Sequence, residues 1–72
     1  MNGYNYLLAC LKECNKDTVL SFNGYHLYYR GYTTGEDSIT IILSDNRKIT
    51  ITRDSNVFSE YSEAYNILTI EL

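Results

Sequence analysis

Apolar residues recur every three or four positions near the start of the chain. Over residues 4–15 they form a single stripe: Tyr4, Leu7, Leu8, Leu11 and Cys14. Because residues three and four apart share one side of a helix, this spacing predicts an amphipathic helix. The polar segment Asn15-Lys16-Asp17 interrupts the repeat, so we expect the helix to end there.

The next segment carries the pattern of a tight β-hairpin. Asn23-Gly24 lies between two runs rich in β-formers, Thr18–Phe22 and Tyr25–Tyr29. Asn-Gly favours a two-residue type I′ turn, because both of its central residues adopt positive φ. That turn fixes a register with three pairs on one face: Phe22 with Tyr25, Leu20 with Leu27, and Thr18 with Tyr29. The opposite face then holds Val19, Ser21, His26 and Tyr28.

A polar loop over Gly31–Asp37 and a second hairpin over Ser38–Arg53 follow. The loop length of this hairpin decides its register. A two-residue loop would place Ile41 opposite Thr50, whereas a three-residue loop pairs apolar with apolar, Ile41 with Ile49 and Ile39 with Ile51. The longer loop, Ser44-Asp45-Asn46, also puts Asn46 where a left-handed conformation is needed, which asparagine tolerates. We therefore predict the three-residue loop.

Residues 55–72 fit two patterns at once. Helical spacing relates Val57, Phe58, Tyr61, Ala64, Tyr65 and Leu68, while strand alternation relates Leu68, Ile70 and Leu72. We predict a short helix near residues 57–64 and then a strand near residues 66–71.

Together these elements predict one α+β domain over residues 1–72. An N-terminal amphipathic helix packs on an antiparallel sheet of two β-hairpins, with a short C-terminal helix and/or strand. One helix covers only one face of such a sheet, so we expect the other face to meet a second copy of the chain. Tyrosine combines a large apolar body with a polar tip and suits interfaces, and the chain has eight. The interface candidates are Val19, Tyr28, Tyr32, Ile42, Tyr61 and Tyr65, whereas Tyr25 and Tyr29 are expected in the core.

The length and the charge of the chain limit the classes of binding partner that we expect. A 72-residue domain buries only roughly 60% of its unfolded surface, so small domains often need a partner subunit or another staple. The formal charge is −3, and residues 54–72 carry four acids (Asp54, Glu60, Glu63 and Glu71) without a single Lys or Arg. Nucleic-acid binders usually present a basic face, so no nucleic-acid partner is expected. No apolar run approaches the roughly 20 residues of a membrane span, so no membrane partner is expected either.

Residues capable of catalysis or metal binding are few. His26 is the only histidine, and no serine or cysteine falls in a nucleophile motif. Cys10 and Cys14 have a spacing found in zinc sites, but a structural site needs four ligands and the chain offers no second cysteine pair. We therefore predict a non-enzymatic protein with no catalytic, cofactor or metal site. Without a disulfide framework or a secretory signal pattern, the expected location is the cytoplasm.

The order of elements, Tyr4–Asn15 and then Thr18–Tyr29 and Ser38–Arg53, in a Tyr-rich chain of this length resembles small uncharacterised proteins of Bacillus prophages. In particular it resembles the YopT-like family, and this resemblance implies homodimers of one helix plus three strands. The first functional hypothesis is accordingly a homodimeric protein-interaction module. The alternative, suggested by the acidic end, is an inhibitor that binds a host protein, namely a nucleic-acid enzyme.

Overall fold

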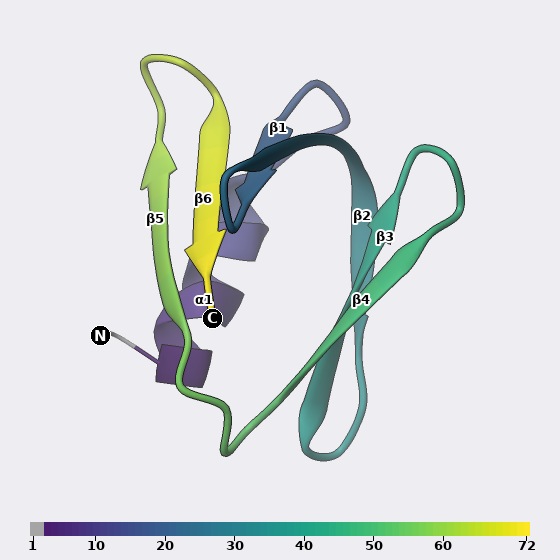
Figure 1. The fold of residues 1–72 in the computed structure, drawn as a ribbon, viewed down its shortest axis with the longest axis vertical. Helices are drawn as coiled ribbons and strands as arrows, with labels where there is room; N and C mark the ends of the chain where they lie inside the picture. The colour runs from purple at the N-terminus through teal and green to yellow at the C-terminus, as the bar shows by residue number, and fades with distance from the viewer. Residues whose placement is uncertain (1–2) are drawn as a thin grey trace.

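The computed structural model describes residues 3–72, which form one helix and a six-stranded mixed sheet (Figure 1). The elements in chain order are α1 (Gly3–Glu13), β1 (Val19–Phe22), β2 (Tyr25–Thr34), β3 (Ser38–Leu43), β4 (Lys48–Thr52), β5 (Phe58–Ser62) and β6 (Ile67–Glu71). The strand order is β4-β3-β2-β1-β6-β5. Neighbouring strands are antiparallel except β1 and β6, which run parallel. Within the described chain, no helix is long and apolar enough to cross a membrane.

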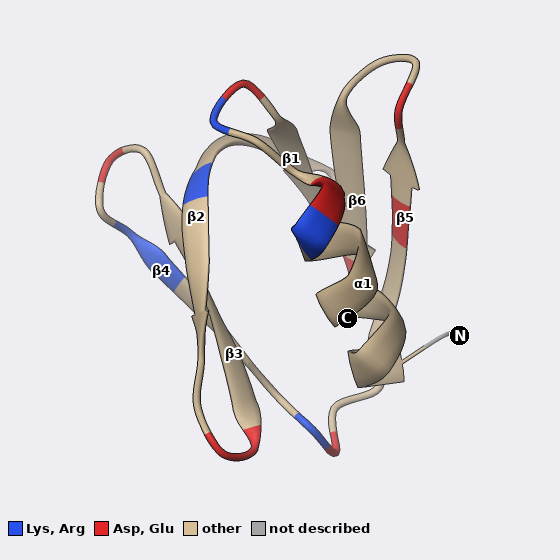
Figure 2. Cartoon of the chain, turned by 180° about the vertical axis from the view of Figure 1, so that it is seen from behind, with Lys and Arg blue, Asp and Glu red and all other residues tan. Residues whose placement is uncertain are grey.

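The N-terminal helix forms where the apolar stripe predicted it. Tyr4, Leu7 and Leu11 of α1 are buried, Leu8 is half-buried, and Cys14 lies just beyond the last helical residue. Figure 2 shows α1 lying across one side of the sheet, in front of β6. The first turn is fixed by the Gly3 N–H, which donates to the Val57 carbonyl oxygen over 3.0 Å. α1 thus covers the inner face of the sheet, the face toward which the core side chains point.

Both predicted hairpin registers are confirmed. In the first hairpin Leu20 pairs with Leu27 and Phe22 with Tyr25, and Asn23 and Gly24 both have positive φ, at 48° and 90°. In the second hairpin the apolar pairs are Ile39 with Ile51 and Ile41 with Ile49. Asn46 takes the left-handed conformation with φ 70°, as the three-residue loop requires.

The predicted loop over Gly31–Asp37 is wrong in its first half. β2 continues to Thr34, and its second part, from Tyr29 to Thr34, pairs with β3 with a register shift between Tyr29 and Gly31. A bulge of this kind bends a strand, and the bend lets one ten-residue strand belong to both halves of the sheet. Tyr32 pairs with Ile41 of β3, and Thr34 pairs with Ile39. Pairing with this apolar strand therefore makes residues 31–34 a strand despite their polar composition.

The predicted fold class is also wrong in its sheet and in its C-terminal helix, whereas the strand predicted near residues 66–71 forms as β6. The α+β composition holds, but the antiparallel sheet of two β-hairpins is instead a mixed sheet of six strands, and no short C-terminal helix forms near residues 57–64. That segment is β5, which forms a third hairpin with β6. The physical reason is long-range: β6 adds to the free edge of β1, and the pairing buries Leu68 and Ile70 completely.

Asn66 joins the parallel strands to the rest of the molecule. Its side-chain oxygen accepts from the Thr18 hydroxyl over 2.7 Å and from the Tyr61 hydroxyl over 2.9 Å. Its amide nitrogen donates to the Asn15 side-chain oxygen over 3.2 Å, and its carbonyl oxygen accepts from the Val19 N–H over 3.1 Å. Asn66 also has φ 53°, which asparagine tolerates better than most residues. One residue therefore links the α1–β1 connection, β5 and the start of β6.

We expect Asn66→Ala to lower the free energy of unfolding by about 1–3 kcal/mol, because partly buried hydrogen bonds are lost and the left-handed backbone becomes strained. Asn66→Gly keeps the left-handed backbone conformation accessible. The decrease in its free energy of unfolding therefore reports the loss of the side-chain hydrogen bonds alone. Urea unfolding measures both values. Asn56→Ala, at an exposed position, is the matched control and should change stability by less than about 0.5 kcal/mol. Wild-type stability in Asn66→Gly would show that the hydrogen bonds contribute nothing.

Candidate functional site

The outer face of the sheet carries an apolar row at its centre. The register places Tyr28 of β2, Val19 of β1 and Ile67 of β6 side by side, and we call these three residues the outer row. Val19 and Ile67 are half-buried, and Tyr28 is 70% exposed. Ile42 of β3 faces the same side, since its neighbours Ile41 and Leu43 point into the core. The predicted interface candidates Val19, Tyr28 and Ile42 thus share one face.

A polar row borders the outer row. His26, Ser21, Thr69 and Glu60 occupy the next positions across β2, β1, β6 and β5. His26 and Glu60 are exposed, and Ser21 and Thr69 are half-buried. An apolar centre with a polar border is the usual composition of a protein–protein interface.

The other three interface candidates lie elsewhere. Tyr32 and Tyr61 are half-buried and pack against the core on the inner side of the sheet, and the Tyr61 hydroxyl is held by Asn66. Tyr65 is 79% exposed in the turn between β5 and β6. The six candidates therefore do not form one surface.

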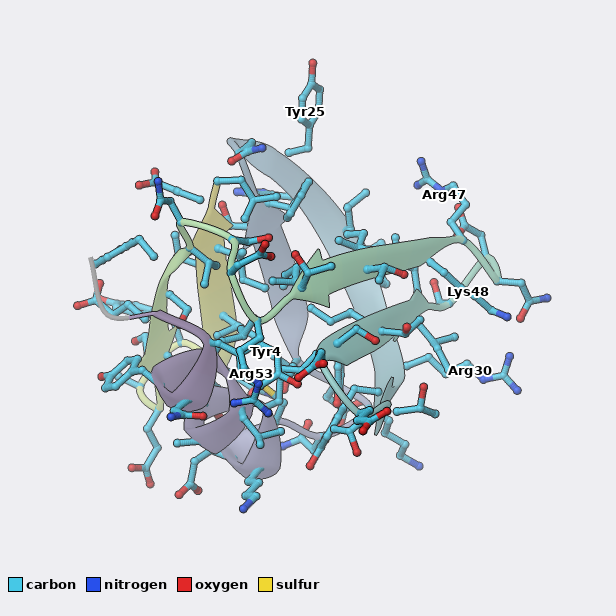
Figure 3. The ribbon with its side chains drawn as sticks, turned by 90° about the horizontal axis from the view of Figure 1, so that it is seen from below. Tyr4, Tyr25, Arg30, Arg47, Lys48 and Arg53 are labelled. Carbon is cyan, nitrogen blue, oxygen red and sulfur yellow. The ribbon has the colours of Figure 1, made fainter. Side chains whose placement is uncertain are left out.

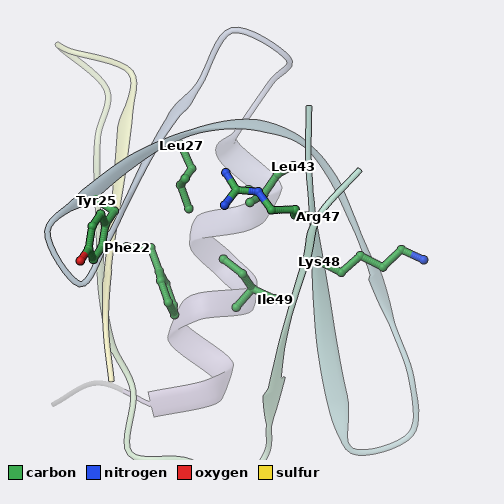
Figure 4. Close-up of a pocket in the computed structure, with 7 residues that line it drawn as sticks. All are labelled: Phe22, Tyr25, Leu27, Leu43, Arg47, Lys48 and Ile49. Atoms are coloured by element: carbon green, nitrogen blue, oxygen red, sulfur yellow. The ribbon is translucent and has the colours of Figure 1, made fainter. Parts of the chain in front are cut away.

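Sequence reasoning missed an apolar cavity on the inner face. A cavity of about 360 Å³ opens between the β1–β2 and β3–β4 hairpins (Figure 4). Each of the strands β1 to β4 contributes one residue to its apolar walls: Phe22, Leu27, Leu43 and Ile49. Tyr25, which was expected in the core, is instead 72% exposed beside this cavity, so that prediction is wrong, whereas Tyr29 is buried as predicted. The registers predicted for the two hairpins could have shown which residues point to the inner face. They could not show which of these residues α1 leaves uncovered.

Positive charge gathers at the same end of the molecule. Arg30, Arg47 and Lys48 are three of the six cationic residues, and they project from the side of the β3–β4 loop (Figure 3). Arg30 Nη1 donates to the Asn46 side-chain oxygen over 2.7 Å. Arg47 Nε donates to Asp45 Oδ2 over 2.6 Å, and the Arg47 backbone N–H donates to Asp45 Oδ1 over 3.1 Å. The hydrogen bonds from Arg47 to Asp45, that of the backbone N–H first, lower the pKa of the Asp45 carboxyl group. In the part of the chain that the structure describes, Asp45 forms an ion pair with Arg47 only, so it offsets one of the three nearby positive charges.

The two cysteines, Cys10 and Cys14, are free thiols near the end of α1. Cys10 is buried, and the half-buried Cys14 thiol donates to the Cys10 carbonyl oxygen over 3.3 Å. Burial raises the pKa of Cys10 and raises the pKa of Cys14 to about 11, so both thiols are protonated at neutral pH and are weak nucleophiles. Among residues 3–72, no three His, Cys, Asp or Glu side chains converge as a metal site would require.

The chain matches no known protein-family model, and comparisons with curated proteins and with solved structures also gave no match. The resemblance to the YopT-like family stays a prediction that no match tests. The six strands observed also exceed the three that this resemblance implies.

We expect stability to fall as the pH rises from about 9 to about 12. The pKa of Cys14 is raised from 9.0 to about 11 and that of Tyr29 from 10.0 to about 12, in both cases chiefly by burial. The unfolded chain therefore loses these protons first, and the stabilisation present below pH 9 is lost as the pH approaches the folded-state values. Cys14→Ser keeps a hydroxyl donor that does not titrate, so its urea unfolding should depend less on pH between 9 and 11. Parallel profiles of wild type and Cys14→Ser would contradict the assignment.

Proposed function

We propose that this chain is a non-enzymatic protein-interaction module that forms a homodimer through the outer face of its sheet. The observation that carries the proposal is the outer row, Tyr28–Val19–Ile67, which runs across the centre of the sheet with a polar row beside it. Because α1 packs on the inner face, no element among residues 3–72 covers this row.

The position of the row favours packing of two sheets face to face. β1 and β2 are the central strands of the sheet, so a partner that binds to them lies over the face of the sheet and not along an edge. Sheets stacked in this way are about 10 Å apart and interleave their side chains. In a two-fold dimer each residue of the row meets the same row of the other copy, so one surface serves both subunits. Burial of this face would also add to the limited core of a small domain.

The cytoplasm is the location we propose for this module. Cys10 and Cys14 are free thiols, which is the usual state of cysteine in a reducing compartment. A prophage origin rests on the resemblance of element order alone.

The alternative, an acidic inhibitor of a host nucleic-acid enzyme, has one supporting feature. Glu60, Glu63 and Glu71 lie on the β5–β6 hairpin or its turn, away from the cations near the β3–β4 loop (Figure 2). However, only Glu60 and Glu71 are neighbours across the two strands, and Glu63 lies in the turn at the far end of the hairpin. Three carboxylates of which two are neighbours give a weak imitation of a phosphate backbone, so the homodimer is the better-supported function.

We expect Tyr28→Lys to raise the dissociation constant of the dimer at least ten-fold. The change removes an aromatic side chain from the outer row and brings two like charges close together across the two-fold axis. Sedimentation velocity over a range of protein concentrations measures the effect. Tyr6→Lys is the matched control, because Tyr6 is an exposed tyrosine (47%) on α1, away from the outer face. A wild-type chain that stays monomeric at millimolar concentration would refute the proposal, as would equal weakening by both variants.

A further inference from the structure

The cavity between the two hairpins is a separate feature on the opposite side of the sheet from the outer row. Phe22, Leu27 and Ile49 are half-buried and Leu43 is nearly fully buried, at 3% exposure. Figure 4 shows Phe22, Leu27 and Ile49 turned toward one another between the hairpins, with α1 behind them. The helix α1 covers only part of the inner face, so the apolar walls of the cavity are open to solvent between the two hairpins.

The size of this cavity suits a small ligand. Its volume of about 360 Å³ lies near the lower end of the range of small-molecule sites, roughly 300–1,000 Å³. At roughly 30 Å³ for each heavy atom, the share of one water molecule in the liquid, it holds about 12 heavy atoms. Such sites combine mainly apolar walls with a few polar groups that orient the ligand.

Two of the three polar side chains that line this cavity are cationic, and the third is the exposed Tyr25. Arg47 and Lys48 belong to its lining, and Figure 4 shows the Arg47 guanidinium turned over the opening, whereas the Lys48 ammonium points outward. Of the guanidinium nitrogens of Arg47, Nε alone contacts Asp45, so the two Nη groups remain available to a ligand. Within residues 3–72 the Arg47 Nη groups have no hydrogen-bond partner and Lys48 has no ion-pair partner. A guanidinium with both Nη groups available is suited to a carboxylate, which it binds through two parallel hydrogen bonds.

We propose that this cavity binds a small amphipathic carboxylate, with its aliphatic chain between Phe22, Leu27 and Ile49 and its head group on Arg47. A saturated acid of about ten carbons has 12 heavy atoms and so matches the volume. One carboxylate charge also matches a loop in which Asp45 already offsets part of the positive charge of Arg47, Lys48 and Arg30.

Calorimetric titration with hexanoate, octanoate and decanoate, each below its micellar concentration, tests the apolar part of the site. We expect the affinity to rise about four-fold for each added methylene, from the transfer free energy of about 0.8 kcal/mol for a buried CH₂, up to about ten carbons. Nitrogen-15 chemical shifts should move at Phe22, Leu27 and Ile49. An affinity independent of chain length, absence of binding, or shifts confined to another part of the chain would overturn the proposal.

Charge variants test the head group. Arg47→Gln should weaken octanoate binding roughly ten-fold and leave the binding of the neutral analogue 1-octanol unchanged, because only the acid uses the guanidinium. Lys12→Gln, an equal change of charge at an exposed position on α1, is the matched control and should have little effect. Equal weakening by Arg47→Gln and Lys12→Gln, or an equal loss of octanol binding in Arg47→Gln, would refute the role of Arg47.

The ligand site and the dimer are tested separately by Tyr28→Lys. Tyr28 points away from the cavity, so this variant should bind octanoate as the wild type does even where it no longer dimerises. Loss of both properties together would mean that a second copy forms part of the cavity, and this would overturn the proposal of a site complete within one chain.

Discussion

The parallel pairing of β1 and β6 is the constraint on which the rest of the structure depends. β1 has only four residues, yet it lies between β2 and β6 and directly follows the α1–β1 connection. Thr18 and Asn66 are 48 positions apart in sequence, so their contact requires closure of a long loop, which costs conformational entropy. The hydrogen bonds of Asn66 and the complete burial of Leu68 and Ile70 offset that cost. Without this pairing, the β5–β6 hairpin would lose the strand hydrogen bonds that join it to the meander of β1 to β4.

That arrangement gives the two faces of the sheet different environments. The inner face is shared between α1, which seals the core around Leu7 and Leu11, and the open cavity at the tips of the first two hairpins. The outer face has no covering element in the described chain, and its apolar residues lie at the centre of the sheet. Charge differs instead between the two edges of the sheet, with acids on β5 and its turn and cations near the β3–β4 loop (Figure 2).

Local signals in the sequence predicted those parts of the fold that local physics decides. Asn23-Gly24 specified its own turn, and the pairing of isoleucines specified the register of the second hairpin. Within residues 55–72, helical spacing relates Val57 to Leu68 and strand alternation relates Leu68 to Leu72. The strands form because β6 pairs with the edge of β1, far away in sequence, and β5 pairs with β6. Asn66 is the turn residue of the third hairpin, but without a following glycine it gives a weaker signal than Asn-Gly. For the candidate sites, alternation in the strands predicted that Val19, Tyr28 and Ile42 share a face. The cavity was not predictable in this way, because it depends on where the helix stops covering inward-facing residues.

Strand alternation also explains how one hairpin can serve two surfaces. Leu27 and Tyr28 are consecutive residues of β2, so their side chains point to opposite faces: Leu27 toward the cavity and Tyr28 into the outer row. A ligand in the cavity and a second copy on the outer face therefore do not compete for the same side chains. They share the backbone of β1 and β2, which pair through Leu20, a fully buried residue, and Leu27. The polar groups beside the two surfaces also differ, Arg47 for the cavity and the row from His26 to Glu60 for the outer face, so the two proposed occupants differ in chemistry.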